Sequence, residues 1–164
     1  SVSSPNGSLW HYLAAGSPVS LPVPMFNILN GGKHASNSAD IQEFMVMPVG
    51  VSSFSDALRA GAEIYQSLKS LLSADGHNTN VGDEGGFAPR GVSNREALDL
   101  VLRAIEDAGH GPGRQCFIAL DVAASELVLD DGRYSLPKDN AVLSASELID
   151  TYQEWVRIYP IVSI

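Results

Sequence analysis

The sequence has one cysteine, Cys116, and few basic residues. A single thiol excludes an internal disulfide framework and a zinc site built on cysteines, and it favours a reducing compartment. No apolar run approaches the roughly 18 residues of a membrane-spanning helix, and the N-terminus lacks the basic and apolar pattern of a signal peptide. We therefore expect a cytoplasmic location, with a surface or secreted role as the alternative.

Positive charge is scarce: 10 lysines and arginines face 19 aspartates and glutamates, which gives a formal net charge of −9. This balance repels nucleic-acid phosphates and anionic lipid surfaces, and it suits hard cations, whose usual ligands are carboxylates. Hydrophobic residues make up 45% of the 164 residues and charged residues 18%. Such a chain is one domain, or a piece of a larger one, with a real core.

Hydrophobic periodicity predicts an α/β fold. The predicted order is strand (21–30), strand (43–49), helix (54–72), helix (93–109), strand (116–122), helix (144–156) and strand (from 161). The closing strand–helix–strand unit favours a parallel arrangement with a right-handed crossover. A complete (β/α)₈ barrel needs about 250 residues, so this chain fits a truncated, partial TIM-like barrel.

Two of the predicted helices carry apolar residues at helical spacing. The first places Phe54 and Leu58 on one stripe with several leucines, and the third is expected to bury Leu148, Ile149, Tyr152, Trp155 and Val156. The chain begins at Ser1 and stops within an apolar segment ending at Ile164. We therefore expect an internal fragment of a longer protein, with residues 1–20 as a connector from a missing N-terminal domain.

A glycine pair with a histidine, Gly31-Gly32-Lys33-His34, precedes Gln42-Glu43 at the start of an apolar strand. A carboxylate against such a strand loses hydration, so its pKa rises and the group can serve as a general acid. The alternative is structural: Glu43 bonds a backbone amide at the strand end, and His34 is an ordinary loop histidine.

A second acidic motif is Gly-Asp-Glu-Gly-Gly-Phe-Ala-Pro at 82–89, in the link between the two central helices. Its glycines allow close approach to a ligand, so Glu84 is a candidate positioned acid, and the alternative is a solvated acidic turn. A third is Ala-Leu-Asp-Val-Ala-Ala-Ser-Glu at 119–126, where Asp121 ends an apolar strand. A charge there is costly unless paired or metal-bound, so Asp121 is a candidate metal ligand, although one aspartate is not a complete site.

The residues alone thus indicate an acidic α/β enzyme with an acid pair, a histidine and one hard-cation ligand. Hydrolysis, glycoside cleavage and proton abstraction beside a carboxylate all remain open.

Five segments in order resemble enolase (phosphopyruvate hydratase) of the bacterial type: 21–34, 42–50, 82–89, 119–126 and 159–164. The resemblance implies an atypical barrel that opens strand–strand–helix–helix, with residues 21–164 as the first half of the C-terminal barrel domain. It also implies Mg²⁺-dependent, reversible dehydration of 2-phosphoglycerate to phosphoenolpyruvate in glycolysis and gluconeogenesis, and a dimeric or octameric full-length protein.

Carried over by motif, Glu84 is the general acid with Glu43 beside it, His34, Gln42 and Glu43 contact substrate, and Asp121 is one Mg²⁺ ligand. The family's lysine base and its two other metal carboxylates have no counterpart in this sequence, so we expect no turnover by residues 1–164 alone. The alternatives are another lyase of the enolase superfamily, a non-catalytic module whose acidic surface binds partner proteins, and a partial sequence with no separate existence.

Overall fold

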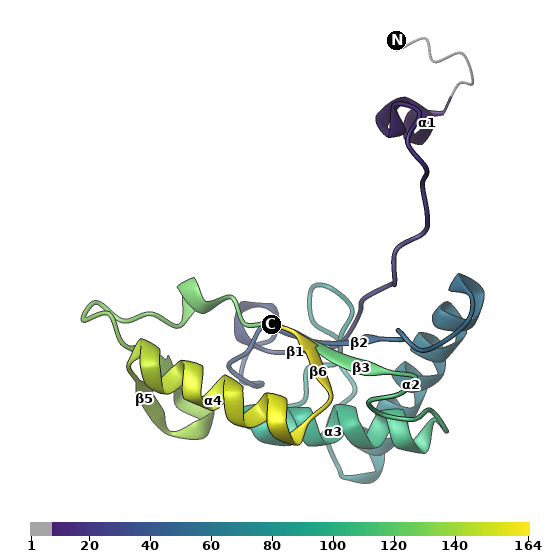
Figure 1. Cartoon of the computed structure of the whole chain (residues 1–164). Helices are drawn as coiled ribbons and strands as arrows, with labels where there is room; N and C mark the ends of the chain where they lie inside the picture. Colours follow the sequence, from purple (N-terminus) through teal and green to yellow (C-terminus); the bar gives the residue numbers. More distant parts are fainter. Residues whose placement is uncertain (1–7) are drawn as a thin grey trace.

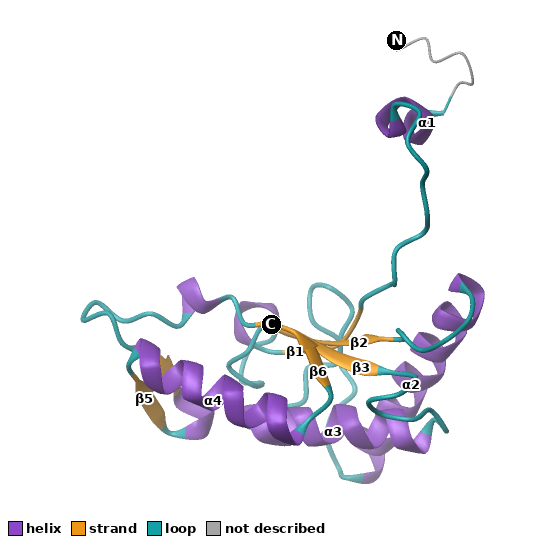
Figure 2. Cartoon of the chain, in the orientation of Figure 1, coloured by secondary structure: helices purple, strands orange, loops and turns teal. Residues whose placement is uncertain are grey.

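A computed structural model describes residues 8–164, and residues 1–7 of the expected connector lie outside them. Figure 1 and Figure 2 show the elements in chain order. They are α1 (Leu9–Ala14), β1 (Phe26–Asn30), η1 (Gly32–His34), β2 (Glu43–Met47), α2 (Phe54–Ala74), α3 (Asn94–Asp107), β3 (Phe117–Asp121), η2 (Ala124–Glu126), β4 (Tyr134–Leu136), η3 (Pro137–Asp139), β5 (Ala141–Leu143), α4 (Ala145–Ile158) and β6 (Ile161–Ser163), where η marks a 3₁₀ turn.

The main sheet has four strands in the order β1-β2-β3-β6. β1 and β2 are antiparallel, β2 and β3 are antiparallel, and β3 and β6 are parallel around α4. The order strand–strand–helix–helix–strand–helix–strand is confirmed, with a short β4–β5 hairpin inserted before α4. Within residues 8–164 the sheet does not close on itself, as expected for part of a barrel.

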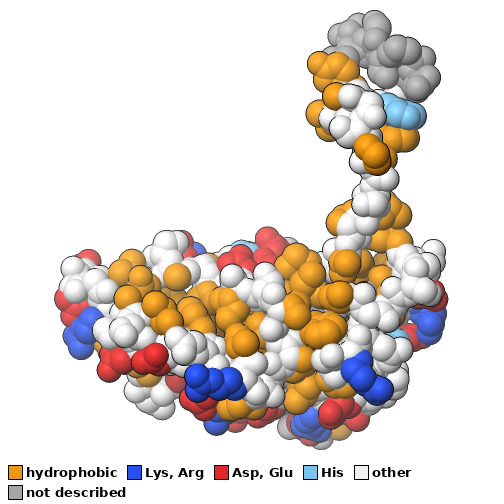
Figure 3. Space-filling view, viewed as in Figure 1, with side chains coloured by type: hydrophobic (Ala, Val, Ile, Leu, Met, Phe, Trp, Pro, Cys, Tyr) orange, Lys and Arg blue, Asp and Glu red, His pale blue; other side chains and the backbone are white. Residues whose placement is uncertain are grey.

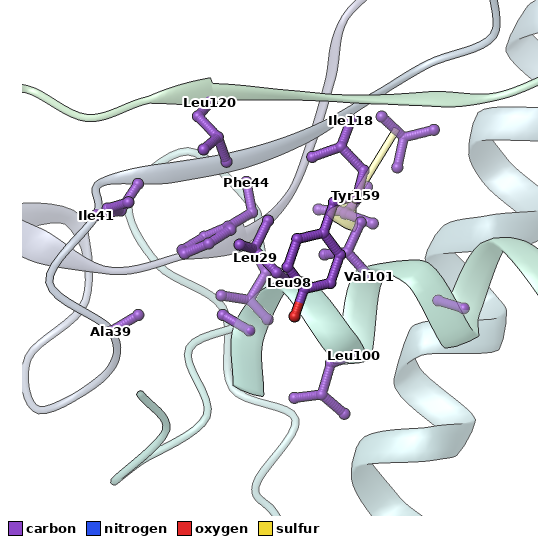
Figure 4. Close-up of a cluster of buried hydrophobic side chains, with 14 of the residues drawn as sticks. Leu29, Ala39, Ile41, Phe44, Leu98, Leu100, Val101, Ile118, Leu120 and Tyr159 are labelled. Carbon is purple, nitrogen blue, oxygen red and sulfur yellow. The ribbon is translucent and has the colours of Figure 1, made fainter. Parts of the chain in front are cut away.

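The helices cover one face of this sheet (Figure 1). Alternation along the strands sends Phe44 and Val46 of β2 to that face, where they pair with Leu120 and Ile118 of β3. All four belong to the buried core, and Figure 4 shows Phe44, Ile118 and Leu120 beside leucine and valine side chains of α3. The residues that alternate with them along the strands, Glu43 and Asp121 included, therefore face the other side of the sheet.

Serine caps set the helix starts that the sequence predicts. Ser93 and Ser144 each accept a bond from the backbone of a glutamate three residues on, whose side chain bonds back to the cap, so α3 and α4 both begin with a capping box. Ser53 caps α2 through its side chain.

Part of the expected helix burial is wrong. In α4, Leu148 and Trp155 are buried, but Ile149 is 54% exposed and Val156 is 48% exposed. Phe54 and Leu58 of α2 are also exposed, at 40% and 53%. These side chains lie on helix flanks that no other described element covers, and apolar side chains are visible across the face drawn in Figure 3.

The segment before β1 stands apart from the sheet. In Figure 1, α1 lies at the end of an extended stretch that leads into β1. None of the α1 residues is buried. Among residues 8–164, the longest helices are too short or too polar to cross a bilayer.

Candidate active site

Three side chains from separate segments meet beside the start of β2. His34 comes from η1, Glu43 opens β2, and Glu84 lies in the loop between α2 and α3. The Nδ1 atom of His34 is 3.7 Å from Glu43 Oε1 and 3.9 Å from Glu84 Oε2. One donor atom from each residue fits within a 4.8 Å cluster. We call His34, Glu43 and Glu84 the acidic trio.

Asp121 belongs to the same edge of the sheet. It ends β3 directly opposite Glu43 in the antiparallel register. Residues opposite one another in such a pair project to the same face. The predicted convergence of Glu43, Glu84 and Asp121 is therefore confirmed as geometry, although the roles assigned to these residues stay predictions.

The two glutamates of the trio have different surroundings. The Glu43 side chain is 13% exposed, and that of Glu84 is 51% exposed. Burial, together with the neighbouring Glu84 and Asp121 carboxylates, raises the pKa of Glu43 to about 7, as the sequence led us to expect. The pKa of Glu84 is lowered, chiefly because it accepts a hydrogen bond from Glu43. As the pH falls through about 7, the pair therefore takes up one shared proton.

The loop that carries Glu84 is fastened to β1. The amide of Asn30 donates to the Phe87 carbonyl at 2.8 Å, and the Phe87 amide donates to the Ile28 carbonyl at 2.9 Å. The Tyr65 hydroxyl donates to the Gly85 carbonyl at 2.8 Å, and its ring stacks on Phe87. Glu84 is exposed, but its backbone is held from both the strand and α2.

Two asparagines of β1 lie under this loop, and the sequence reasoning missed them. A Cβ atom placed on Gly86 would lie 2.8 Å from Asn27 Oδ1 and closer still to Asn30 Oδ1. Both amide atoms of Asn27 and the Oδ1 of Asn30 are buried without a hydrogen-bond partner. The sequence did offer one signal for them: two asparagines stand in the otherwise apolar stretch Phe-Asn-Ile-Leu-Asn of β1.

The carboxylate of Asp121 suits a hard cation. One oxygen, Oδ1, accepts a bond from the Ala123 amide at 3.0 Å, which fixes the side chain. Asp121 is exposed and forms no ion pair with a lysine or arginine among residues 8–164, so its second oxygen is available to a metal. This donor fits Mg²⁺, which takes one or two protein carboxylates and completes its shell with water or substrate oxygens.

Gln42 lies next to Glu43, and the structure gives its backbone a clear function. The Gln42 carbonyl accepts from the Gly31 amide at 3.0 Å and from the Asn30 side chain at 3.4 Å. This pairing folds the segment 31–42 back on itself and places His34 beside the strand. Substrate contacts by Gln42 and His34 stay predictions.

An open α/β sheet with helices on one face, and three carboxylates gathered at one edge, fit part of a barrel-type enzyme domain. Residues 18–164 match the family described as "Enolase, C-terminal TIM barrel domain". The chain belongs to this family, and its fold is that of part of the barrel. Membership assigns the lyase-type fold of the enolase superfamily, whose members generally bind Mg²⁺ and act on small molecules.

Proposed function

We propose that this chain supplies the acid side of a bacterial-type enolase site that interconverts 2-phosphoglycerate and phosphoenolpyruvate in the cytoplasm. One observation carries the proposal. Glu43 and Glu84 share a proton, and Asp121 on the neighbouring strand has a free carboxylate oxygen. Dehydration needs both, because a hydroxyl leaves as water and negative charge develops elsewhere on the substrate.

In this proposal Glu84 delivers the proton to the departing hydroxyl, and its greater exposure within the pair supports that role. The buried Glu43 holds the proton while the site is empty and passes it to Glu84 across their hydrogen bond. His34 borders both carboxylates and is placed to contact the substrate beside them.

Asp121 would hold the Mg²⁺ ion, through the oxygen that Ala123 leaves free. When bound, the ion would stabilise the negative charge that forms on the substrate after proton removal. The lysine base and the further metal carboxylates implied by the resemblance come from residues other than these. We therefore expect this chain to bind substrate with Mg²⁺ but not to convert it.

Isothermal titration calorimetry with 2-phosphoglycerate tests the proposal. We expect binding in the presence of Mg²⁺, none with EDTA, and loss of the Mg²⁺-dependent binding in Asp121→Asn. Asp130→Asn, which removes an exposed carboxylate nearby in sequence, should bind like the wild type. Binding that ignores Mg²⁺, or that survives Asp121→Asn, would contradict the proposal, and binding of a different carboxylate substrate instead would favour another lyase of the superfamily.

A further inference from the structure

The histidine of the acidic trio lies close to both carboxylates but beyond good hydrogen-bond distance of either one. Its histidine–carboxylate separations of 3.7 and 3.9 Å exceed the roughly 2.7–3.2 Å of a good hydrogen bond. The Nδ1 atom of His34 is buried and has no hydrogen-bond partner. The Nδ1 atom of His34 and one oxygen from each carboxylate therefore face one another within 4.8 Å.

That space has the dimensions of a cation site. Bonds of about 2.0–2.2 Å in a tetrahedral shell place neighbouring donor atoms about 3.3–3.5 Å apart. The two histidine–carboxylate separations need to contract by only a few tenths of an ångström to reach this value, and the three donor atoms all lie within 4.8 Å of one another.

No basic side chain competes for this space. Among residues 8–164, no lysine or arginine forms an ion pair with Glu43 or Glu84. Lys33, the immediate neighbour of His34, pairs with Glu126 instead. Once the proton shared by Glu43 and Glu84 has left, their two carboxylates together balance the charge of a divalent cation.

The donors are also held in place by the backbone. The His34 amide bonds the Gly31 carbonyl at 3.1 Å, and the His34 carbonyl accepts from the Asp83 amide at 3.4 Å. Glu43 is fixed in the ladder with β3. Little ordering is left for a bound ion to impose, which favours binding.

We propose that His34, Glu43 and Glu84 bind a zinc-type divalent cation at a position distinct from Asp121. The imidazole nitrogen selects this class of metal, because Mg²⁺ prefers oxygen ligands while Zn²⁺ accepts nitrogen and carboxylate ligands together. Three protein ligands leave one position open for water. An ion there engages both glutamates, so Zn²⁺ also blocks their proton transfer, but the binding itself does not depend on the proposed reaction.

Calorimetric titration of the whole chain with Zn²⁺ near neutral pH is the test. We expect one site of 1:1 stoichiometry, weakened at least about tenfold by His34→Gln and by Glu84→Gln. His11→Gln removes an exposed histidine in α1 and should change the affinity less than about twofold. The ring ¹⁵N signal of His34 Nδ1 should shift on binding, while that of His11 stays in place.

Zn²⁺ affinities of two variants show which residues hold the ion. Asp121→Asn should leave Zn²⁺ affinity within about threefold of the wild type, since it removes a neighbouring charge but no ligand. If His34→Gln melts at a lower temperature, its loss of affinity could reflect unfolding. Glu84→Gln then provides the test, because Glu84 lies in an exposed loop and its replacement should not destabilise the fold. Unchanged affinity in Glu84→Gln, or a loss in Asp121→Asn as large as in His34→Gln, would overturn the proposal.

Discussion

Glu43, the first residue of β2, lies directly opposite Asp121, the last residue of β3. The antiparallel pairing of these strands causes this, because the start of one strand then meets the end of the next. The two carboxylates project to the face of the sheet that the helices leave open. One strand pair thus places an acid whose pKa is raised beside a candidate metal ligand.

The titration of Glu43 should report its neighbours. Replacing Glu84 by Gln removes a hydrogen-bond partner and a negative charge, so the pKa of Glu43 should fall from about 7. It should stay above 4.5, because burial, the largest cause of the shift, remains. Side-chain carboxyl ¹³C NMR against pH measures this directly. Asp121→Asn serves as the comparison and should lower the pKa less, and equal or larger effects from Asp121→Asn would contradict the geometry.

The pH dependence of stability follows from the same shift. A carboxyl whose folded-state pKa exceeds its unfolded value binds its proton more tightly in the folded chain. The stabilisation from Glu43 is therefore complete below pH 4.5 and is lost as the pH rises to about 7. Glu84 acts oppositely, but its lowered pKa confines its effect to pH values below about 4.5.

The free energy of unfolding should therefore fall between pH 4.5 and 7 in the wild type, by at most about 3 kcal/mol from Glu43. Glu43→Gln should remove this part of the fall, because it keeps the shape of the protonated acid without titrating. Urea unfolding at a series of pH values measures the difference between the two proteins. Parallel curves would show that the pKa of Glu43 is not raised on folding.

Gly86 should be intolerant of a side chain. An alanine methyl there would press on the amides of Asn27 and Asn30, so Gly86→Ala should cost about 1–3 kcal/mol and displace the loop with Glu84. The pKa of Glu43 should fall with that displacement. Gly85→Asn is the matched control, because Gly85 has open space and asparagine tolerates its positive φ of 85°. A normal melting temperature and Glu43 titration in Gly86→Ala would refute this account.

Asn94 should be the costliest polar substitution outside the site. Its Oδ1 accepts from the amides of Asp40 and Ile41 at 2.9 and 3.0 Å, and its Nδ2 donates to the carboxylates of Asp40 and Asp139. The side chain is fully buried, so Asn94→Ala leaves several groups without partners and should cost about 3 kcal/mol.

The neighbouring exposed pair Arg95–Glu154 offers the control for Asn94. Arg95→Ala removes a solvent-screened ion pair and should cost less than about 1 kcal/mol. Equal losses from the two substitutions in urea unfolding would mean that Asn94 does not join the segment 31–42 to α3.

Local sequence signals predicted much of this fold. The Ser-x-x-Glu patterns at Ser93 and Ser144 marked two helix starts, and the apolar runs around Phe44 and Leu120 marked two buried strands. The exposure of Ile149 and Val156 could not be foreseen, because helical spacing shows that a face is apolar but not whether a partner covers it. The β4–β5 hairpin has strands of only three residues, too short for periodicity to reveal.

The site, like the fold, has features that the sequence predicted and features that it did not. The raised pKa of Glu43 followed from a carboxylate beside an apolar strand, and resemblance brought Glu84, His34 and Asp121 to one place. The asparagines beneath the loop were missed, because their role depends on the long-range contact between β1 and residues 82–87. No local pattern encodes that contact.

The most direct measurement follows the Glu43 carboxyl by ¹³C NMR while Mg²⁺ is added to the chain. If the ion binds at Asp121, its charge faces Glu43 and favours the ionised carboxyl, so the pKa of Glu43 should fall below about 7 as Mg²⁺ saturates. Asp121→Asn should abolish this response. A pKa that ignores Mg²⁺, or that responds equally in Asp121→Asn, would contradict a single site formed by the acid pair and Asp121.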